Sequence, residues 1–138
     1  MAAAFAEETG NTKVRVIGGY RSEAYQQNLY ENKVEEIGEV LASEWVAQPG
    51  HSEHHTGLAV DVGIASGAGA KTFTNEGTYA WYCDNAMHYG LINRFAEHKQ
   101  EITRIMGEPW HYRYVGVEDA TKIMQLGVTL EEYLQDYY

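Results

Sequence analysis

Two separated stretches of the chain carry residues that could together hold a catalytic metal ion. Residues 51–61 form a His-rich loop, bracketed by glycines, that leads into a short apolar strand with an Asp inside it. Residues 108–111 place a Glu three positions ahead of a His, at the mouth of a strand expected over 110–115. Two imidazoles and one carboxylate leave a position on zinc open for water, and a spare carboxylate can act as the base. These residue types predict a catalytic zinc site.

Asp61 is the most informative residue of the first stretch. It interrupts the apolar run Leu-Ala-Val-Asp-Val over residues 58–62. A carboxylate there is costly unless it is paired or bound to a metal. An ion pair with an Arg is the structural alternative.

The spacing of the other candidates leaves two questions open. In a regular strand, every second residue before Asp61 lies on the same face as Asp61, and this would include His55. Gly57 permits a bend that removes this parity, so the spacing does not distinguish His54 from His55. Glu108 and His111 cannot share a face of a regular strand. Glu108 is therefore predicted in the preceding turn, as a base that reaches over the metal. The alternative is a solvated Glu108 beside an aromatic sheet face.

Composition limits the class of protein. At 138 residues, with 44% hydrophobic and 22% charged residues, the chain fits one globular domain. A net charge of -10 argues against a nucleic-acid partner. Cys83 is the sole cysteine, so an intramolecular disulfide is impossible. No apolar run reaches the ~20 residues of a membrane span, and the first five residues lack a signal-peptide pattern.

The order of predicted elements indicates an α+β domain with a small antiparallel or mixed sheet flanked by helices. Helices are predicted over 2–9, from 23 to between 29 and 41, over 78–89 and 118–126, and from 129 onward behind a capping box. Residues 42–57 and 96–107 are expected to be loop, and 65–70 a flexible surface loop. Strands are predicted over 13–17, 58–64, 91–95 and 110–115.

Three motifs in this order resemble the VanY-type D-alanyl-D-alanine carboxypeptidases. They are Ser52-x-His54-x-x-Gly57-x-Ala59-x-Asp61, residues 108–116 (Glu-Pro-Trp-His-x-Arg-Tyr-Val-Gly) and residues 19–26 (Gly-Tyr-Arg-Ser-x-x-x-Gln). That family of zinc enzymes includes the D,D-dipeptidase/carboxypeptidases of vancomycin resistance and L,D-carboxypeptidases. The resemblance covers about residues 14–133 and implies a Hedgehog/D,D-peptidase-like fold. Residues 91–95 depart from it, since relatives commonly carry a more apolar Gly-Phe-Ile-Leu-Arg-Tyr run there.

The resemblance also implies roles for individual residues. His54, Asp61 and His111 are expected to bind Zn2+, and Glu108 to be the catalytic base. Arg21 is expected to stabilise the oxyanion or to pair with the substrate's terminal carboxylate. Ser52 and Gln26 are expected to meet the substrate, although Ser52 could merely cap the loop and Gln26 could be a solvated helix position.

The implied activity is a zinc-dependent D,D-carboxypeptidase, in which Glu108 activates a zinc-bound water to cut the terminal D-Ala-D-Ala bond of peptidoglycan stem peptides. One alternative is an L,D-carboxypeptidase acting on tetrapeptide stems. Another is a zinc-stabilised binding module without activity, which the presence of Glu108 disfavours. Residues 1–138 are expected to be one catalytic domain of a longer chain. Its expected location is the bacterial cell envelope, with any export signal or anchor outside this sequence, and the cytoplasm is the alternative.

Overall fold

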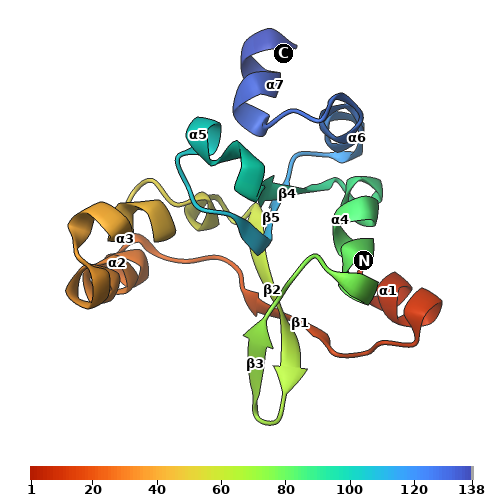
Figure 1. The fold of residues 1–138 in the computed structure, drawn as a ribbon, viewed down its shortest axis with the longest axis horizontal. Coiled ribbons are helices and arrows are strands. Elements are labelled where there is room, and N and C mark those ends of the chain that lie inside the picture. The colour runs from red at the N-terminus through yellow and green to blue at the C-terminus, as the bar shows by residue number, and fades with distance from the viewer. Residues whose placement is uncertain (138) are drawn as a thin grey trace.

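The computed structural model describes residues 1–137, and its centre is an antiparallel sheet of five strands (Figure 1). Four strands follow the order β1-β2-β5-β4, and β3 pairs with the far part of β2. This confirms the predicted α+β class with a small antiparallel sheet. The strands are β1 (Val14–Gly18), β2 (Ala59–Ser66), β3 (Gly69–Thr72), β4 (Leu91–Phe95) and β5 (Glu108–Tyr114).

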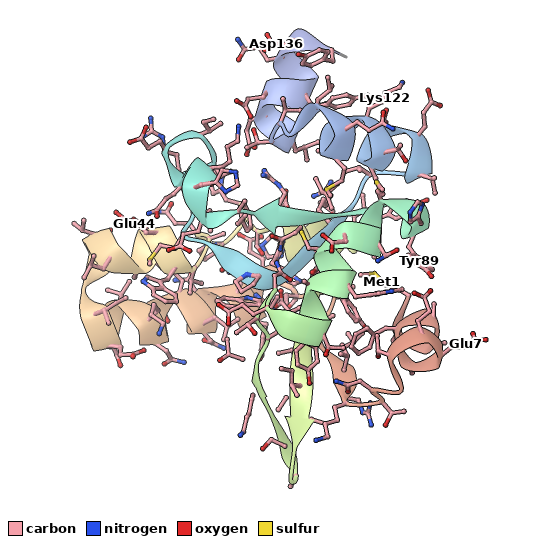
Figure 2. All side chains as sticks on the ribbon, turned by 45° about the vertical axis from the view of Figure 1, so that its right-hand side comes forward. Met1, Glu7, Glu44, Tyr89, Lys122 and Asp136 are labelled. Carbon is pink, nitrogen blue, oxygen red and sulfur yellow. The ribbon has the colours of Figure 1, made fainter. Side chains whose placement is uncertain are left out.

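Helices lie on opposite sides of this sheet. Figure 1 shows α2 and α3 on one side, α1 and α4 on the other, and α6 and α7 together at the C-terminal end. The turned view of Figure 2 keeps this separation, with Glu44 of α3 far from Glu7 of α1. The helices are α1 (Ala2–Thr9), α2 (Glu23–Ile37), α3 (Glu39–Trp45), α4 (Ala80–Asn85), α5 (Gln100–Thr103), α6 (Val117–Leu126) and α7 (Leu130–Asp136).

Local sequence signals explain several helix ends. The Ser22 side chain accepts a hydrogen bond from the backbone N–H of Tyr25 and so begins α2. Gly38, at φ 84°, ends α2, but α3 starts directly after it, so residues 42–45 are helical rather than loop as expected. The predicted capping box at Thr129 and Glu132 is present at the start of α7. The helix expected over 78–89 is instead broken into α4 between two 3-10 turns.

The expectation of a flexible loop over 65–70 was wrong. β2 continues to Ser66 and turns back into β3, with Ser66 opposite Gly69. Gly67 occupies the left-handed region, at φ 58°, which a two-residue hairpin turn requires. Backbone pairing with β2 therefore outweighs the low strand propensity of these small residues. Figure 1 shows this hairpin projecting away from the helices.

The main core fills one face of the sheet. Val62 of β2 and Tyr112 of β5 pack in it with Phe5 of α1 and Tyr82 of α4. Because successive side chains of a strand point to opposite faces, Asp61 and His111 are turned to the other face, toward α2 and α3. No helix within residues 1–137 has both the length and the apolar character needed to cross a membrane.

Candidate active site

The first half of the site is a cross-strand pair at the centre of the sheet. Asp61 of β2 lies directly opposite His111 of β5, and both side chains are buried. His111 Nδ1 lies 3.0 Å from Asp61 Oδ1. Directly opposed residues have Cβ atoms only about 5 Å apart, so the register alone brings these two side chains together.

His54 reaches the same point from a 3-10 turn, Glu53–Thr56, that precedes β2. Ser52 caps this turn by accepting a hydrogen bond from His54 N. His54 Nδ1 lies 2.7 Å from the Gly19 carbonyl oxygen, to which it can only donate, and in the neutral ring this tautomer presents the Nε2 lone pair as a metal ligand. His54 Nε2 lies 3.3 Å from Asp61 Oδ2. The turn removes the strand parity that had favoured His55.

His55 has a structural role instead. Its Nδ1 donates to the Arg21 carbonyl at 2.8 Å, and its Nε2 accepts from Gly50 N–H at 3.2 Å. Both ring nitrogens are thus used to join the loop before α2 to the loop before β2. His51 is exposed at the edge of the cleft.

His54, Asp61 and His111 form the one group of potential metal ligands found within residues 1–137. One ligand atom from each lies within 4.8 Å of the others, and all three residues are buried. A tetrahedral zinc with bonds of about 2.0–2.1 Å separates adjacent ligand atoms by about 3.3 Å. His111 Nδ1 lies 3.0 Å from Asp61 Oδ1 and His54 Nε2 lies 3.3 Å from Asp61 Oδ2, so both ring nitrogens face the same carboxylate at separations near this value. The donor set therefore fits Zn2+.

Glu53 orients His111 from behind, a contact that the sequence analysis missed. Its Oε2 lies 3.2 Å from His111 Nε2, which leaves Nδ1 facing Asp61. A carboxylate on the outer nitrogen of a metal-binding His fixes both its tautomer and its ring orientation. Burial alone would raise the pKa of Glu53, but the His111 hydrogen bond and the Arg94 charge lower it to about 2.

Arg94 of β4 extends this network to the C-terminal helix. Its Nε donates to Glu53 at 2.8 Å, and its two terminal nitrogens bind the Glu131 carboxylate of α7 at 3.0 and 2.5 Å. Such a two-point Arg–carboxylate pair restricts both side chains. A sequence gives little sign of these contacts, because the partners lie 41 and 37 positions apart.

Glu108 lies in β5, so its predicted placement in the preceding turn was wrong. An irregularity in the pairing of β4 with β5 brings it to the same cleft as His111, with Oε2 3.7 Å from His111 Nδ1. Burial raises the pKa of Glu108 to about 7, and the Asp61 carboxylate also raises it, although His111 opposes both. A carboxylate with this pKa can exchange protons near neutral pH.

The charges of Asp61 and His111 depend on each other. Burial would raise the pKa of Asp61, but hydrogen bonds with His111 and His54 hold it well below its usual range. Burial would lower the pKa of His111, but its bonds to Asp61 and Glu53 raise it to about 9. In the absence of a metal, the cluster thus favours an imidazolium between two carboxylates.

Arg21 lies beside the cluster and pairs with Asp61 Oδ2 through Nη2. Gly18 makes this approach possible, since a Cβ there would come within 2.7 Å of Asp61 Oδ2 and 3.2 Å of Arg21 Nη2. The guanidinium carries five N–H donors, so donors remain for another anion. The ion pair expected as the alternative for Asp61 therefore exists alongside its place in the metal-binding group.

Gln26 is less exposed than its alternative implied, and Ser52 has the capping role that was given as its alternative. Gln26 is 1% exposed rather than solvated, and its Nε2 donates to the Ala47 carbonyl at 2.8 Å. Its Oε1 has no hydrogen-bond partner within residues 1–137. Ser52 caps the turn that carries His54, and its side chain also borders the cleft.

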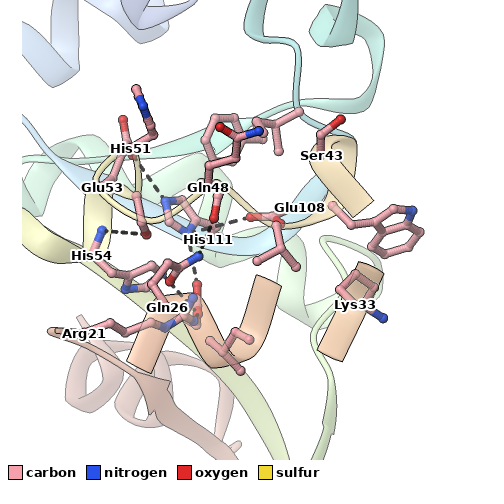
Figure 3. Close-up of a pocket in the computed structure, with 18 of the residues that line it drawn as sticks. Arg21, Gln26, Lys33, Ser43, Gln48, His51, Glu53, His54, Glu108 and His111 are labelled. Atoms are coloured by element: carbon pink, nitrogen blue, oxygen red, sulfur yellow. Dashed lines mark hydrogen bonds and ion pairs between the residues drawn. The ribbon is translucent and has the colours of Figure 1, made fainter. Parts of the chain in front are cut away.

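All seven predicted site residues line one open cleft of about 830 Å³. Figure 3 shows Glu53, His54, Glu108 and His111 grouped at one part of this cleft, with Lys33 and Ser43 at another. The volume is in the range of small-molecule and peptide pockets. A three-ligand metal group with a neighbouring, partly buried carboxylate in an open cleft is the arrangement of a mononuclear metallopeptidase.

Comparisons with known proteins agree with this class. The family model of VanY, described as D-alanyl-D-alanine carboxypeptidase, matches residues 1–117. A D-alanyl-D-alanine carboxypeptidase of Enterococcus faecalis is 44% identical over an alignment of 128 residues, and the match covers 86% of this chain and 46% of that protein. The chain thus spans about half the length of that relative. It belongs to the VanY family of D-alanyl-D-alanine carboxypeptidases.

Solved structures of relatives support both the fold and the metal. A VanY D,D-pentapeptidase from a VanB-type resistance cassette, in complex with Zn(II), has a TM-score of 0.82 and 38% identity, covering 96% of this chain and 81% of that one. The LdcB LD-carboxypeptidase has a TM-score of 0.83 and 37% identity, covering 99% and 68%. The zinc expected from the sequence agrees with the first structure and with the His-Asp-His group found here.

Proposed function

We propose that this domain is a zinc D,D-carboxypeptidase that removes the terminal D-Ala from peptidoglycan stem peptides. The observation that carries the proposal is the buried group of His54, Asp61 and His111 with Glu108 3.7 Å from His111, in an open cleft. The names of the relatives support the type of substrate. The proposed setting is the bacterial cell envelope, where such stem peptides occur, with the cytoplasm as the alternative.

In this proposal His54, Asp61 and His111 hold the zinc. Bound zinc supplies a Lewis acid that polarises the scissile carbonyl and makes the attacking water more acidic. His54 presents Nε2 because its Nδ1 bonds to Gly19, and His111 presents Nδ1 because its Nε2 bonds to Glu53. Both ligands are thus oriented before metal arrives, which reduces the cost of binding it.

Glu108 acts as the general base. Its carboxylate takes a proton from the attacking water and passes it to the departing amine of the terminal D-Ala. Burial raises its pKa to about 7, which is in the range of a carboxylate that serves as a general base near neutral pH. Without this carboxylate the cleft could still bind metal and peptide, but it would lack a proton acceptor.

Arg21 binds the terminal carboxylate of the substrate in this arrangement. Its planar guanidinium suits a carboxylate. Its Nη2 pairs with Asp61, so the remaining N–H donors of the guanidinium are available to the substrate carboxylate beside the metal group. This places the last peptide bond, rather than an inner one, beside Glu108. Ser52 borders the same part of the cleft, and Gln26 Oε1 offers an acceptor for a substrate amide.

The second candidate is L,D-carboxypeptidase activity, which the similarity to LdcB supports. Zinc-loaded protein incubated separately with pentapeptide and tetrapeptide stems distinguishes the two, with the released amino acid identified by mass. D-Ala released from the pentapeptide alone supports the D,D assignment. Release from the tetrapeptide alone replaces it with the L,D assignment. No release from either peptide, with zinc bound, supports a binding module.

A further inference from the structure

The irregular pairing of β5 is what places Glu108 and His111 on one face. They are three residues apart, so a regular strand would turn them to opposite faces. Asn93 of β4 pairs with Tyr112, and Phe95 pairs with Glu108, so two steps along β4 match four steps along β5. The additional residues form a bulge, and this bulge lets both side chains line the cleft.

A bulge leaves backbone groups without partners in the ladder, and they must be satisfied in another way. The Asn93 side chain does this, since its Nδ2 donates to the Glu108 carbonyl at 3.0 Å and to the His111 carbonyl at 3.2 Å. An amide nitrogen has two N–H donors, so one side chain can hold both ends of the bulge.

A second Asn supports the orientation of this amide. Asn75 Nδ2 lies 3.5 Å from Asn93 Oδ1, and Asn75 Oδ1 accepts from the Tyr112 hydroxyl at 3.1 Å. The Glu108 and His111 carbonyls face the Asn93 nitrogen, and the Asn75 donor faces the Asn93 oxygen. Only one of the two possible orientations of the Asn93 amide satisfies both sets of partners. The connection leads from the buried core at Tyr112 to the backbone of the candidate base.

We propose that Asn93 is a positioning residue that holds the β5 bulge and thereby keeps Glu108 on the metal face of the sheet. The proposal rests on the function proposed above. His111 has independent supports, because its ring bonds to both Asp61 and Glu53. Among the hydrogen bonds and ion pairs found within residues 1–137, the side chain of Glu108 has only its pairing with His111 at 3.7 Å. Loss of Asn93 therefore displaces Glu108 more than it displaces the metal ligand.

The primary test uses Asn93→Leu, which keeps the approximate size and removes the donors, and Asn93→Asp, which keeps the shape and removes the amide N–H groups. We expect kcat on pentapeptide stems to fall by about 100-fold, the cost of a displacement of about 1 Å. KM and zinc affinity, measured by chelator competition, should each stay within about threefold. Asn85→Leu is the matched control. It loses the hydrogen bond that the Asn85 side-chain amide donates to the Trp81 carbonyl, away from the cleft, and should keep kcat.

A double-mutant cycle separates positioning from general destabilisation. In a Glu108→Gln background, Asn93→Leu should cost less than threefold in kcat because its effect passes through Glu108. Equal losses in both backgrounds, or full kcat in both Asn93 variants, would overturn the proposal.

Hydrogen exchange gives a readout that does not depend on turnover. The backbone amides of residues 108 and 110–112 should exchange faster in zinc-loaded Asn93→Leu than in the parent protein, while those of α1 stay protected. Unchanged exchange at the bulge would also overturn the proposal. If the parent protein cleaves no stem peptide, the proposed function fails, whereas this measurement still decides whether Asn93 holds the bulge.

Discussion

The two ends of the cleft are built in different ways. At the metal end, His54, Asp61 and His111 are each less than a tenth exposed, and their polar atoms bond to neighbouring groups. At the helical end, the lining comes from α2 and α3, which pack mainly against each other. The lining side chains at that end are more accessible, and they include exposed Asn32, Glu36, Ser43 and Trp45.

This difference suggests a division of roles along the cleft. Chemistry requires reacting groups fixed to within fractions of an ångström, and a sheet with bonded side chains provides this. Recognition of a longer peptide can use exposed side chains on a helix pair, such as Trp45, with Lys33 Nζ 6.0 Å from its ring centroid. Substitutions at the metal end should therefore change metal content or kcat, and those at the helical end should change KM.

The largest expected effect is the loss of a metal ligand. His54→Ala should abolish zinc retention after dialysis and reduce activity to background, because Asp61 and His111 alone leave the site incomplete. His55→Ala is the control, since its ring joins two loops and lies outside the metal group. Zinc content is measured by elemental analysis. Retained zinc in His54→Ala with loss in His55→Ala would show that the ligand set is wrong.

Glu108→Gln should have the next largest effect. It removes the proton acceptor but keeps the shape, so kcat should fall by about 100-fold to 10,000-fold. Zinc content and melting temperature should stay close to those of the parent protein, as Glu108 is not in the metal group. Steady-state kinetics on pentapeptide stems provides the measurement. An unchanged kcat would remove Glu108 from its proposed role.

Glu53→Ala tests whether the residues that support the metal ligands contribute to the metal end of the cleft. It removes the carboxylate that orients His111, so zinc affinity should fall by about 10-fold to 100-fold. Chelator competition gives this value directly. Glu118→Ala, which breaks an exposed pair with Lys122, serves as the control and should leave zinc affinity unchanged. Equal zinc affinities in the two variants would show that Glu53 does not contribute to zinc binding through His111.

The smallest effect is expected at the helical end. Trp45→Ala should raise KM for pentapeptide stems by a few fold, about 1 kcal/mol of binding, with kcat unchanged. Zinc affinity should be unaffected, because Trp45 lies outside the metal group. Val40→Ala, on the exposed side of α3, is the control. A fall in kcat instead would contradict the proposed division of roles.

Local patterns predicted much of this molecule. Ser22 and the capping box at Thr129 predicted helix starts that the structure contains, because caps depend on neighbours within a few residues. The same local reasoning failed for residues 65–70, where pairing with β2 decided the outcome. It also did not predict that helix continues beyond residue 41 to Trp45, although the weakening expected at Gly38 does separate α2 from α3.

For the site, the residue types were readable from the sequence and the resemblance, but the arrangement was not. The sequence and the resemblance together indicate seven candidate residues, and all seven line one cleft in the structure. Glu53 was missed because a residue beside His54 would point elsewhere on an extended strand, and only the 3-10 turn directs it to His111.

The sequence by itself determined which zinc-binding groups are available, since imidazole and carboxylate are side chains whose chemistry suits zinc. Only the tertiary structure decided which groups meet. The β2–β5 register opposes Asp61 and His111, the 3-10 turn selects His54, and the bulge brings Glu108 to their face. The physical reason is that these contacts depend on strand pairing between distant segments, whose register is set by the packing of both faces of the sheet.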